Sequence, residues 1–477
     1  MRAPVEPASG PAFSADELVA AAGGTFLTRS GRPIRGGAVD SRLVRAGNLF
    51  VALPGERTDG HHFLAAAVNA GAAALVVTVP PAPDELARLG DVTVLLVDDA
   101  LDALGQIAAA WRSRFDPLVV GVTGSIAKTS TKEAIGSVLA QRLRTLRNEG
   151  NRNNEIGLPL TLLDLGPEHE AAVLEMGMYV GGEIRDLAAI GRPRIGVVTA
   201  VQPVHLSRIG SIEAIEQAKG ELVEALPAAN AGGVAVLNAD DPRVSRMDAR
   251  TNARVVRYGF DAAADVTARE VTAAGFDGMR FVVRLADGRE RSVSVPGLGR
   301  LAVHNALAAA AVGDAAGLDL EDIAAGLAAG WSAPHRTSIV RSGGVTILDD
   351  SYNASPGSVE AALEALAGLP GRRVAVLGEM LELGDVAEDG HRRVGGVAAG
   401  VVEMLVVVGA GAHGIADGAR SAGMPPDAIV VVPDRLAALD ALGARLRPGD
   451  VVLVKASRGV ELDRLVDDLA AAPDMGA

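Results

Sequence analysis

Short runs of aliphatic residues alternate along most of this chain with longer segments whose apolar residues recur at helical spacing. Aliphatic runs of about four to eight residues indicate buried strands, and apolar residues at every third or fourth position indicate helices. In the first part of the chain, the predicted strands are 49–55, 73–79 and 92–99, and the predicted helices are 61–71 and 100–115. A proline at position 117 then interrupts the pattern, so we expect a domain boundary there.

The alternation resumes beyond this proline, with predicted strands at 118–122, 171–177, 195–201 and 233–239. Helical segments between these strands predict a parallel sheet covered by helices. Residues 265–297 read differently, because short strands there are separated by turns at 276–278 and 286–288. That spacing predicts a small antiparallel meander. Two predicted helices, 304–317 and 321–331, complete this part.

A third part contains five more predicted strands, at 345–351, 372–379, 404–411, 428–432 and 450–457. Helices between them predict a second parallel sheet. Gly409, Gly411 and Gly414 have the G-x-G-x-x-G spacing of a dinucleotide-binding turn, but no acidic residue ends the next strand at the required place. We therefore favour an ordinary strand-to-helix turn. The expected fold is α/β in three domains, 1–115, 116–332 and 333–477.

Composition excludes several function classes. With 45 Lys and Arg against 59 Asp and Glu, the net charge is −14, which argues against nucleic acid as the main partner. The chain has no Cys, so it has neither a disulfide framework nor a thiolate metal site, which is compatible with a cytoplasmic protein. No apolar run is long enough for a membrane helix, and Pro and Glu occupy the N-terminal stretch where a signal peptide would be apolar.

The strongest local signal for chemistry is the stretch VVGVTGSIAKTSTKEAI, residues 119–135. A strand, a turn of small residues, Lys-Thr and a helix follow one another, as in a phosphate-binding loop. Lys128 would reach the outer phosphates of a nucleotide, and the hydroxyl of Thr129 would ligate magnesium. The glycine positions of the strict motif hold Val122 and Ala127. The alternative is an ordinary strand-turn-helix with an exposed lysine.

Three further features surround this loop in the sequence. Glu175 and His205 come at or just after the ends of two predicted strands, where a parallel sheet forms its ligand crevice. They are candidate ligands for magnesium, and the histidine would suit a second ion such as manganese; the alternative is that both are hydrogen-bonded loop residues. Lys219 lies on a helix, and the residues alone favour a solvated lysine. The loop 149–159 is rich in Asn, so it could read sugar hydroxyls or uracil edges, or simply form a turn.

Several stretches then occur together in a fixed order: GVTGSIAKTSTKE, EGNRNNEIGLPLTLL, LEMGM, HLSRIGSIEAIEQAKGEL, VLNADDP, HNALAAAA, LDDSYNASPGSVEAAL, LGEMLELG and LVKASRG. They resemble the Mur ligase family, and AVDSRLVRAGNLFVALPGERTDGH resembles the uridine-nucleotide domain of its members. The resemblance extends from about residue 13 to the last predicted helix. It implies a UDP-substrate domain, a central P-loop-like ATPase domain and a C-terminal Rossmann-like domain that closes on ATP and the incoming substrate.

The function implied by this resemblance is an ATP-dependent amide ligase. DDSYNASP with LGEMLELG points to the member that joins D-alanyl-D-alanine to UDP-N-acetylmuramoyl-tripeptide through an acyl phosphate, in peptidoglycan precursor synthesis. The resemblance also implies ATP and two magnesium ions as cofactors, no membrane span, a cytoplasmic location and a monomer. It leaves open whether the tripeptide carries diaminopimelate or lysine.

The resemblance assigns roles to individual residues of this chain. Those expected at ATP are Thr123, Gly124, Ser125, Ile126, Ala127, Lys128, Thr129, Ser130, Asn305, Arg336 and Asp350. Those expected at the UDP-substrate are Ser41, Arg42, Asn151, Asn153 and Asn154, and those on the dipeptide side are Tyr352, Asn353, Lys455, Ser457 and Arg458. Glu175, His205 and Lys219 become metal ligands, the last as a carbamate, which replaces its reading as a solvated residue.

Departures from the family pattern concern the nucleotide contacts. Ile126 and Ala127 replace Asn and Gly in the loop, Ala200 stands where the family has Asn, and Leu301 and Ala302 replace a His-Asn pair. We expect Ala127 to keep the positive φ of the usual glycine under strain, and glycine there to tighten ATP binding. Two alternatives remain: another ligase of the same superfamily, including a folylpolyglutamate type, and a weakly active nucleotide-binding partner protein.

Overall fold

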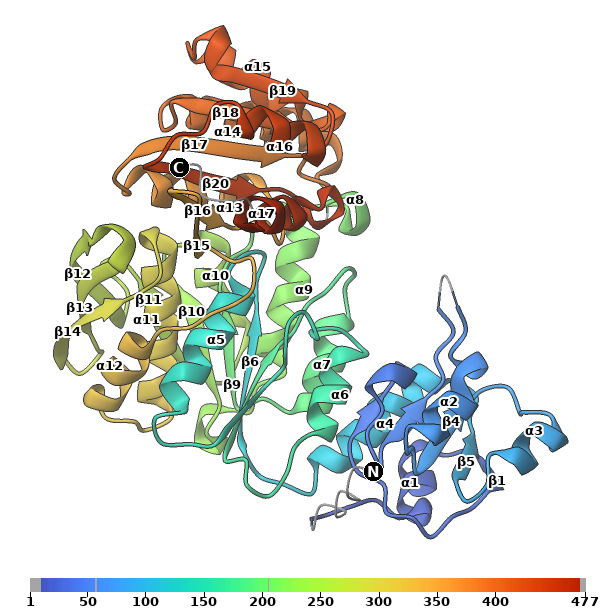
Figure 1. The fold of residues 1–477 in the computed structure, drawn as a ribbon. Helices are drawn as coiled ribbons and strands as arrows, with labels where there is room; N and C mark the ends of the chain where they lie inside the picture. The colour runs from blue at the N-terminus through green and yellow to red at the C-terminus, as the bar shows by residue number, and fades with distance from the viewer. Residues whose placement is uncertain (1–9, 56–57, 205, 472–477) are drawn as a thin grey trace. The chain divides into compact units, whose positions relative to one another are not determined.

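The protein is described here by a computed structural model, which covers residues 10–55, 58–204 and 206–471. Contacts between residues divide the chain into two compact units. Unit 1 comprises residues 1–121, 143–177 and 183–194, and unit 2 comprises residues 122–142, 178–182 and 195–477. The strands form three sheets (Figure 1), so the predicted α/β class is confirmed. The predicted division into three domains stays a prediction.

The first sheet has five strands in the order β1-β5-β4-β3-β2. Its strands are β1 (Thr25–Thr28), β2 (Gly37–Ala38), β3 (Leu49–Val51), β4 (Ala74–Val77) and β5 (Thr93–Leu96). β2 to β5 pair in parallel, and β1 pairs antiparallel with β5. The helices around them are α1 (Ala15–Ala22), α2 (Leu64–Asn69), α3 (Pro83–Arg88) and α4 (Ala100–Arg112). The predicted helix 61–71 begins as a 3-10 turn, Gly60–Phe63, and becomes α-helical only at Leu64.

The central sheet has nine strands in the order β14-β13-β12-β11-β10-β9-β6-β8-β7. Its strands are β6 (Leu118–Thr123), β7 (Thr145–Arg147), β8 (Ala171–Glu175), β9 (Ile195–Val198), β10 (Val234–Asn238), β11 (Arg254–Gly259), β12 (Val266–Ala273), β13 (Met279–Arg284) and β14 (Glu290–Val295). β12, β13 and β14 form the predicted antiparallel meander, with turns where the sequence placed them. The meander is not separate, however, because β12 pairs in parallel with β11 and extends the same sheet.

Helices lie between the strands of the central part as predicted, but the predicted helix 304–317 begins five residues earlier, at Gly299. The helices are α5 (Lys128–Leu139), α6 (Gly157–Leu163), α7 (Glu183–Gly191), α8 (Leu206–Ile209), α9 (Ile212–Glu224), α10 (Pro242–Ser245), α11 (Gly299–Ala315) and α12 (Leu320–Ala329). α11 packs on α5 and also contacts β11 and β12. Figure 1 shows α11 and α12 beside the meander strands. α5 is therefore fixed by a neighbour that comes about 170 residues later in the chain.

The third sheet has six strands in the order β15-β16-β20-β17-β18-β19. Its strands are β15 (Ser338–Ser342), β16 (Val345–Asp349), β17 (Arg372–Gly378), β18 (Met404–Val408), β19 (Ile429–Val432) and β20 (Asp450–Lys455). The five predicted strands pair in parallel, and β15, which was not predicted, pairs antiparallel with β16. The helices are α13 (Pro356–Ala367), α14 (Ala387–Ala399), α15 (His413–Ser421), α16 (Arg435–Gly443) and α17 (Leu462–Ala471). Aliphatic cores lie on both faces of this sheet.

The glycines after β18 serve packing. A Cβ at Gly411 would lie 2.1 Å from Oε1 of Glu379, and a Cβ at Gly414 would lie 2.9 Å from the Cβ of His391 on α14. These glycines therefore let the start of α15 approach its neighbours. This geometry supports the reading of an ordinary strand-to-helix turn.

Candidate functional site

The loop between β6 and α5 is held by a segment that follows β9. The hydroxyl of Thr199 donates to the carbonyl oxygen of Ile126 at 2.6 Å, and the amide of Ser125 donates to the carbonyl oxygen of Ala200 at 2.7 Å. The amide of Gln202 donates to the hydroxyl of Ser125, which donates to the carbonyl oxygen of Gln202. Thr199 and Gln202 were not singled out from the sequence, although both stand in the stretch that departs from the family pattern.

Two loop positions have the left-handed backbone that favours glycine. Gly124 has a φ of 149°, and a Cβ there would lie 1.8 Å from the hydroxyl oxygen of Thr199, so no larger residue fits. Ala127 has φ 64° and ψ 0°. An L-residue in that conformation costs about 1–2 kcal/mol. The prediction that Ala127 keeps a positive φ under strain is therefore confirmed.

Lys128 begins α5 and turns back over the loop. Its ammonium donates to the carbonyl oxygen of Gly124 at 2.7 Å, with that of Ser125 at 3.4 Å. The hydroxyl-bearing residues of the first turn, Thr129 and Ser130, follow it, and Thr129 is buried. The amide groups at the start of a helix and a lysine above them are what an anionic phosphate requires.

Lys219 is buried on the inner face of α9, with 3 % of its surface exposed. It has the same helical spacing as the buried residues Ile215 and Leu222, so the apolar face of α9 already marked its position. Burial lowers the pKa of this amine well below its usual value, and the positive charge of Lys128 lowers it further. Among the described residues, none forms an ion pair with it. The reading as a solvated lysine is therefore wrong.

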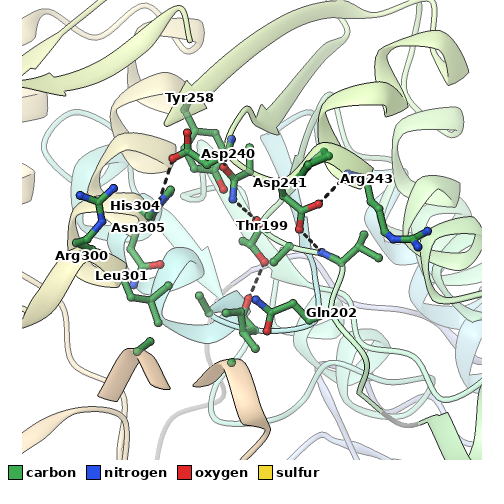
Figure 2. Close-up of a pocket in the computed structure, with 18 of the residues that line it drawn as sticks. Thr199, Gln202, Asp240, Asp241, Arg243, Tyr258, Arg300, Leu301, His304 and Asn305 are labelled. Carbon is green, nitrogen blue, oxygen red and sulfur yellow. Dashed lines mark hydrogen bonds and ion pairs between the residues drawn. The ribbon is translucent and has the colours of Figure 1, made fainter. Parts of the chain in front are cut away.

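A cavity of about 630 Å³ opens beside the loop, and Figure 2 shows its lining. Ile126, Ala127 and Asn305 of α11, three of the residues expected at ATP, are among those that line it. The amide oxygen of Asn305 accepts from the hydroxyl of Thr131 at 3.0 Å, which ties α11 to α5. The further lining residues are Thr199, Ala200, Val201, Gln202, Asn238, Asp240, Asp241, Pro242, Arg243, Arg246, Tyr258, Arg300, Leu301, His304, Gly357, Ala361 and Glu364.

One end of this cavity carries aromatic and polar side chains. Nε2 of His304 lies 3.3 Å from a carboxylate oxygen of Asp240, and its ring meets the ring of Phe260 edge to face. Burial lowers the pKa of His304; Asp240 opposes this shift and Arg300 adds to it. Burial, with Asp241 and Asp240 nearby, raises the pKa of Tyr258, so its phenol stays protonated. None of these residues was assigned a role from the sequence, although Asp240, Asp241 and His304 stand in the stretches VLNADDP and HNALAAAA that carry the family resemblance.

Glu175 lies at the end of β8 in unit 1 and is 2 % exposed. One carboxylate oxygen accepts from the side-chain amide of Asn153 at 2.7 Å. The other is buried and has no hydrogen-bond partner among the described residues. Because an ionised carboxylate is costly to bury without a partner, this oxygen is suited to hold a cation.

The Asn-rich loop is largely structural. Asn153 holds Glu175, and the side chain of Asn154 accepts from the amide of Gly157 at the start of α6. The carbonyl oxygen of Asn151 accepts from the amide of Asn153. Asn148, which was not predicted, is fully buried and bonds the backbone of Glu175 through both ends of its amide.

The other two residues expected at the UDP-substrate, Ser41 and Arg42, lie in a 3-10 turn of unit 1. Ser41 begins this turn, which Asp40 caps, and Arg42 extends into solvent beside Asp40.

Arg336 and Asp350 are not among the residues that line the described cavity. Instead α13 lines it with Gly357, Ala361 and Glu364. Asp350 accepts from the ammonium of Lys455 and from the amide of Thr337.

The described residues also bear on metal and membrane binding. His205, an expected metal ligand, lies outside the described residues. Within the described ranges there is no cluster of three His, Cys, Asp or Glu side chains that would hold a metal. No helix in these ranges is long and apolar enough to cross a membrane.

Profiles of known domains match three consecutive segments. The Mur ligase family catalytic domain matches residues 33–112, the Mur ligase middle domain 122–313, and the Mur ligase glutamate ligase domain 335–458. A ligase of Mycobacterium tuberculosis is 40 % identical over 475 residues, which cover 92 % of both chains. The chain belongs to the Mur ligase family. That relative is a UDP-N-acetylmuramoyl-tripeptide–D-alanyl-D-alanine ligase, and so is a Bacillus subtilis relative, 36 % identical over 92 % of this chain and 94 % of its own.

Solved structures agree with this assignment. MurF of Acinetobacter baumannii superposes with a TM-score of 0.86 at 29 % identity, over 98 % of this chain and all of that one. MurF of Thermotoga maritima, solved in complex with ADP, superposes with a TM-score of 0.77 at 28 % identity, over 91 % and 97 %. This Mur ligase therefore shares nearly its whole length with enzymes of one kind.

Proposed function

We propose that this Mur ligase joins D-alanyl-D-alanine to UDP-N-acetylmuramoyl-tripeptide at the expense of ATP, in the synthesis of peptidoglycan precursors. The observation that carries the proposal is the loop 123–129, in which Ala127, with its left-handed backbone, lines the large cavity and the ammonium of Lys128 lies on the carbonyl oxygen of Gly124. Relatives that match nine-tenths of the chain are named for this reaction. ATP binding is supported by the related enzyme solved with ADP.

The chemistry begins with a carboxylate that is a poor electrophile. An oxygen of the tripeptide carboxylate attacks the γ-phosphorus of ATP, the bond to the β-phosphate oxygen breaks, and ADP leaves. The amine of D-alanyl-D-alanine then attacks the acyl carbon and loses a proton, and inorganic phosphate departs as the amide forms. In this proposal Lys128 moves from the loop carbonyls to the transferred phosphoryl group, where negative charge develops.

The nucleotide would occupy the cavity, with its phosphates at residues 123–130 and its base near Asn305. Arg336 and Asp350 would join it from the C-terminal part, although neither lines the cavity as described. Ser41, Arg42, Asn151, Asn153 and Asn154 would face the UDP-substrate. Asn153 and Asn154 are already bonded within the protein and Arg42 is paired with Asp40, so each of these side chains would exchange a protein partner for the substrate.

Magnesium fits the residues present, because one buried oxygen of Glu175 has no hydrogen-bond partner among the described residues and Thr129 offers a hydroxyl. Glu175, Thr129, His205 and a carbamate on Lys219 would hold the ions. Bound magnesium would neutralise charge on the phosphoryl oxygens. Lys219 suits carbamylation, because burial lowers the pKa of its amine and so favours the uncharged form, which can attack carbon dioxide and release a proton to leave an anionic carbamate.

The proposal is tested by measuring phosphate release from ATP with the tripeptide substrate, with and without D-alanyl-D-alanine, and by identifying the amide product by mass spectrometry. We expect release to require the tripeptide and to be strongly accelerated by the dipeptide, since closure should protect the acyl phosphate from water. Tripeptides with diaminopimelate and with lysine show which one is used. Rapid ATP hydrolysis without either substrate, or nucleotide binding with no turnover, would contradict the proposal.

A further inference from the structure

The ring of Tyr352 is shared by two guanidinium groups. Cζ of Arg336 lies 4.2 Å from the ring centroid and Cζ of Arg458 lies 5.5 Å from it. Both distances are within the range of cation–π attraction. Among the described residues, no carboxylate pairs with either guanidinium. Two unneutralised cations on one ring repel each other, so an anion bound beside them would be favoured.

Lys455 and Ser457, also expected on the dipeptide side, already form hydrogen bonds within the protein. The ammonium of Lys455 donates to a carboxylate oxygen of Asp350, to the carbonyl oxygen of Asn353 and, at 3.4 Å, to the carbonyl oxygen of Asp350. Its three hydrogens therefore have partners, and its side chain is 4 % exposed. The hydroxyl of Ser457 accepts from the amide of Leu381 and donates to the carbonyl oxygen of Ala354. Lys455 and Ser457 thus shape the loop and leave no charged donor for a substrate.

Arg336 differs from Arg458 in how it is held. His335 and Thr337, on either side of Arg336, have φ values of 57° and 54°, which are costly for residues with side chains. His335 bonds Asp349 at 2.8 Å, and the amide of Thr337 bonds Asp350. This strained segment fixes the backbone of Arg336. Arg458 begins the 3-10 turn after β20 and is exposed, so its fork of donors is open to a ligand.

We propose that Arg458, seated on Tyr352, binds the carboxylate of the incoming dipeptide and so makes a free C-terminus a requirement of the reaction. The inference rests on the proposed function, in which D-alanyl-D-alanine offers one anionic group and one nucleophilic amine. Arginine matches a carboxylate with two parallel hydrogen bonds. Arg336 would raise the local positive potential and leave the amine end of the dipeptide free to reach the acyl phosphate.

The test compares two amine substrates, D-alanyl-D-alanine and its neutral C-terminal amide, in the full-length enzyme. We expect the wild type to favour the carboxylate at least about tenfold in kcat/KM. Arg458→Gln should raise KM for D-alanyl-D-alanine by about 10- to 100-fold while KM for the amide changes little, so the preference disappears. KM for ATP should stay the same. Arg464→Gln, which removes an exposed arginine paired with Glu461, is the matched control.

Two outcomes would overturn the inference: Arg458→Gln that keeps the wild-type preference, or an equal loss on both amines together with a higher KM for ATP, which would place Arg458 at the nucleotide. Arg458→Lys keeps the charge without the fork, so we expect it to restore part of the preference. Failure of the proposed function would look different, because the wild type would then form no amide with either amine.

Discussion

Replacing Ala127 with glycine isolates the strain in the phosphate-binding loop. Ala127 has φ 64° and ψ 0°, and its carbonyl oxygen accepts from the amide of Thr131, so it opens α5 in the left-handed conformation. Alanine pays about 1–2 kcal/mol there. Glycine removes that cost but adds about 0.4–1 kcal/mol of backbone entropy to the unfolded chain. The net expectation is a gain in stability of about 0.5–1 kcal/mol.

The structure also indicates whether this strain lowers the stability of the fold or the affinity for ATP. Hydrogen bonds from Thr199 and Gln202 hold the loop in the left-handed shape within the folded protein, so the cost falls on folding. ATP affinity should therefore change little unless the methyl group of Ala127 crowds a phosphate oxygen. Tightening towards tenfold, as the sequence alone suggested, would reveal such crowding.

A suitable assay is native-state hydrogen exchange of the first turn of α5, because unfolding of a chain this large is not a two-state process. The expected gain slows exchange by about two- to fivefold. Ala140→Gly is the matched control at the other end of the same helix, where φ is −63° and glycine should cost about 0.5–1 kcal/mol. If both variants speed exchange equally, Ala127 is not strained and the reasoning fails.

Three further changes test the site. Lys219→Met should abolish ligation yet keep or raise stability, because the lowered pKa means that the folded protein disfavours the charged amine, and methionine removes that cost. Calorimetry beside the ligation assay checks both parts, and a clear loss of stability would contradict the prediction. Thr199→Val leaves the carbonyl oxygen of Ile126 without its donor, so the loop should loosen and KM for ATP should rise severalfold; an unchanged KM would show that the loop does not need this bond. Burial lowers the pKa of His304, so the unfolded chain binds the extra proton first and stability should fall as pH drops below about 6.5. His304→Gln should flatten that slope in denaturant titrations, and an identical slope would assign it to other groups.

Much of the fold was predictable because burial leaves a periodic trace in the sequence. The buried strands β4, β9, β10, β18 and β20 consist mostly of aliphatic residues, which is what a strand covered on both faces requires. The loop before α5 was also visible, since a lysine and threonine at a strand-to-helix turn suit phosphate. The positive φ of Ala127 followed from the same comparison with a glycine position.

The edges of the sheets were not predictable in the same way. β1, β2, β7 and β15 are short and only partly buried, so their composition resembles that of loops. Their strand pairing is decided by the neighbour that each one meets, as β15 meets β16. The 3-10 turn before α2 is likewise a local adjustment that helical spacing does not distinguish.

Some features of the candidate site were likewise predictable from the sequence, and others only from the tertiary structure. Residue types and their order indicated Lys128, Thr129 and Glu175, because phosphate and cations demand particular groups after particular strands, whereas Asn305 was expected only from the family resemblance. Only the tertiary structure decided which side chains can still bind a ligand. The ammonium of Lys455 already donates to Asp350, whereas Arg458 is not paired with a carboxylate among the described residues. It also decided that α13 lines the cavity beside the loop. Availability depends on partners that are distant in sequence and close in space, and no local pattern of residues records such partners.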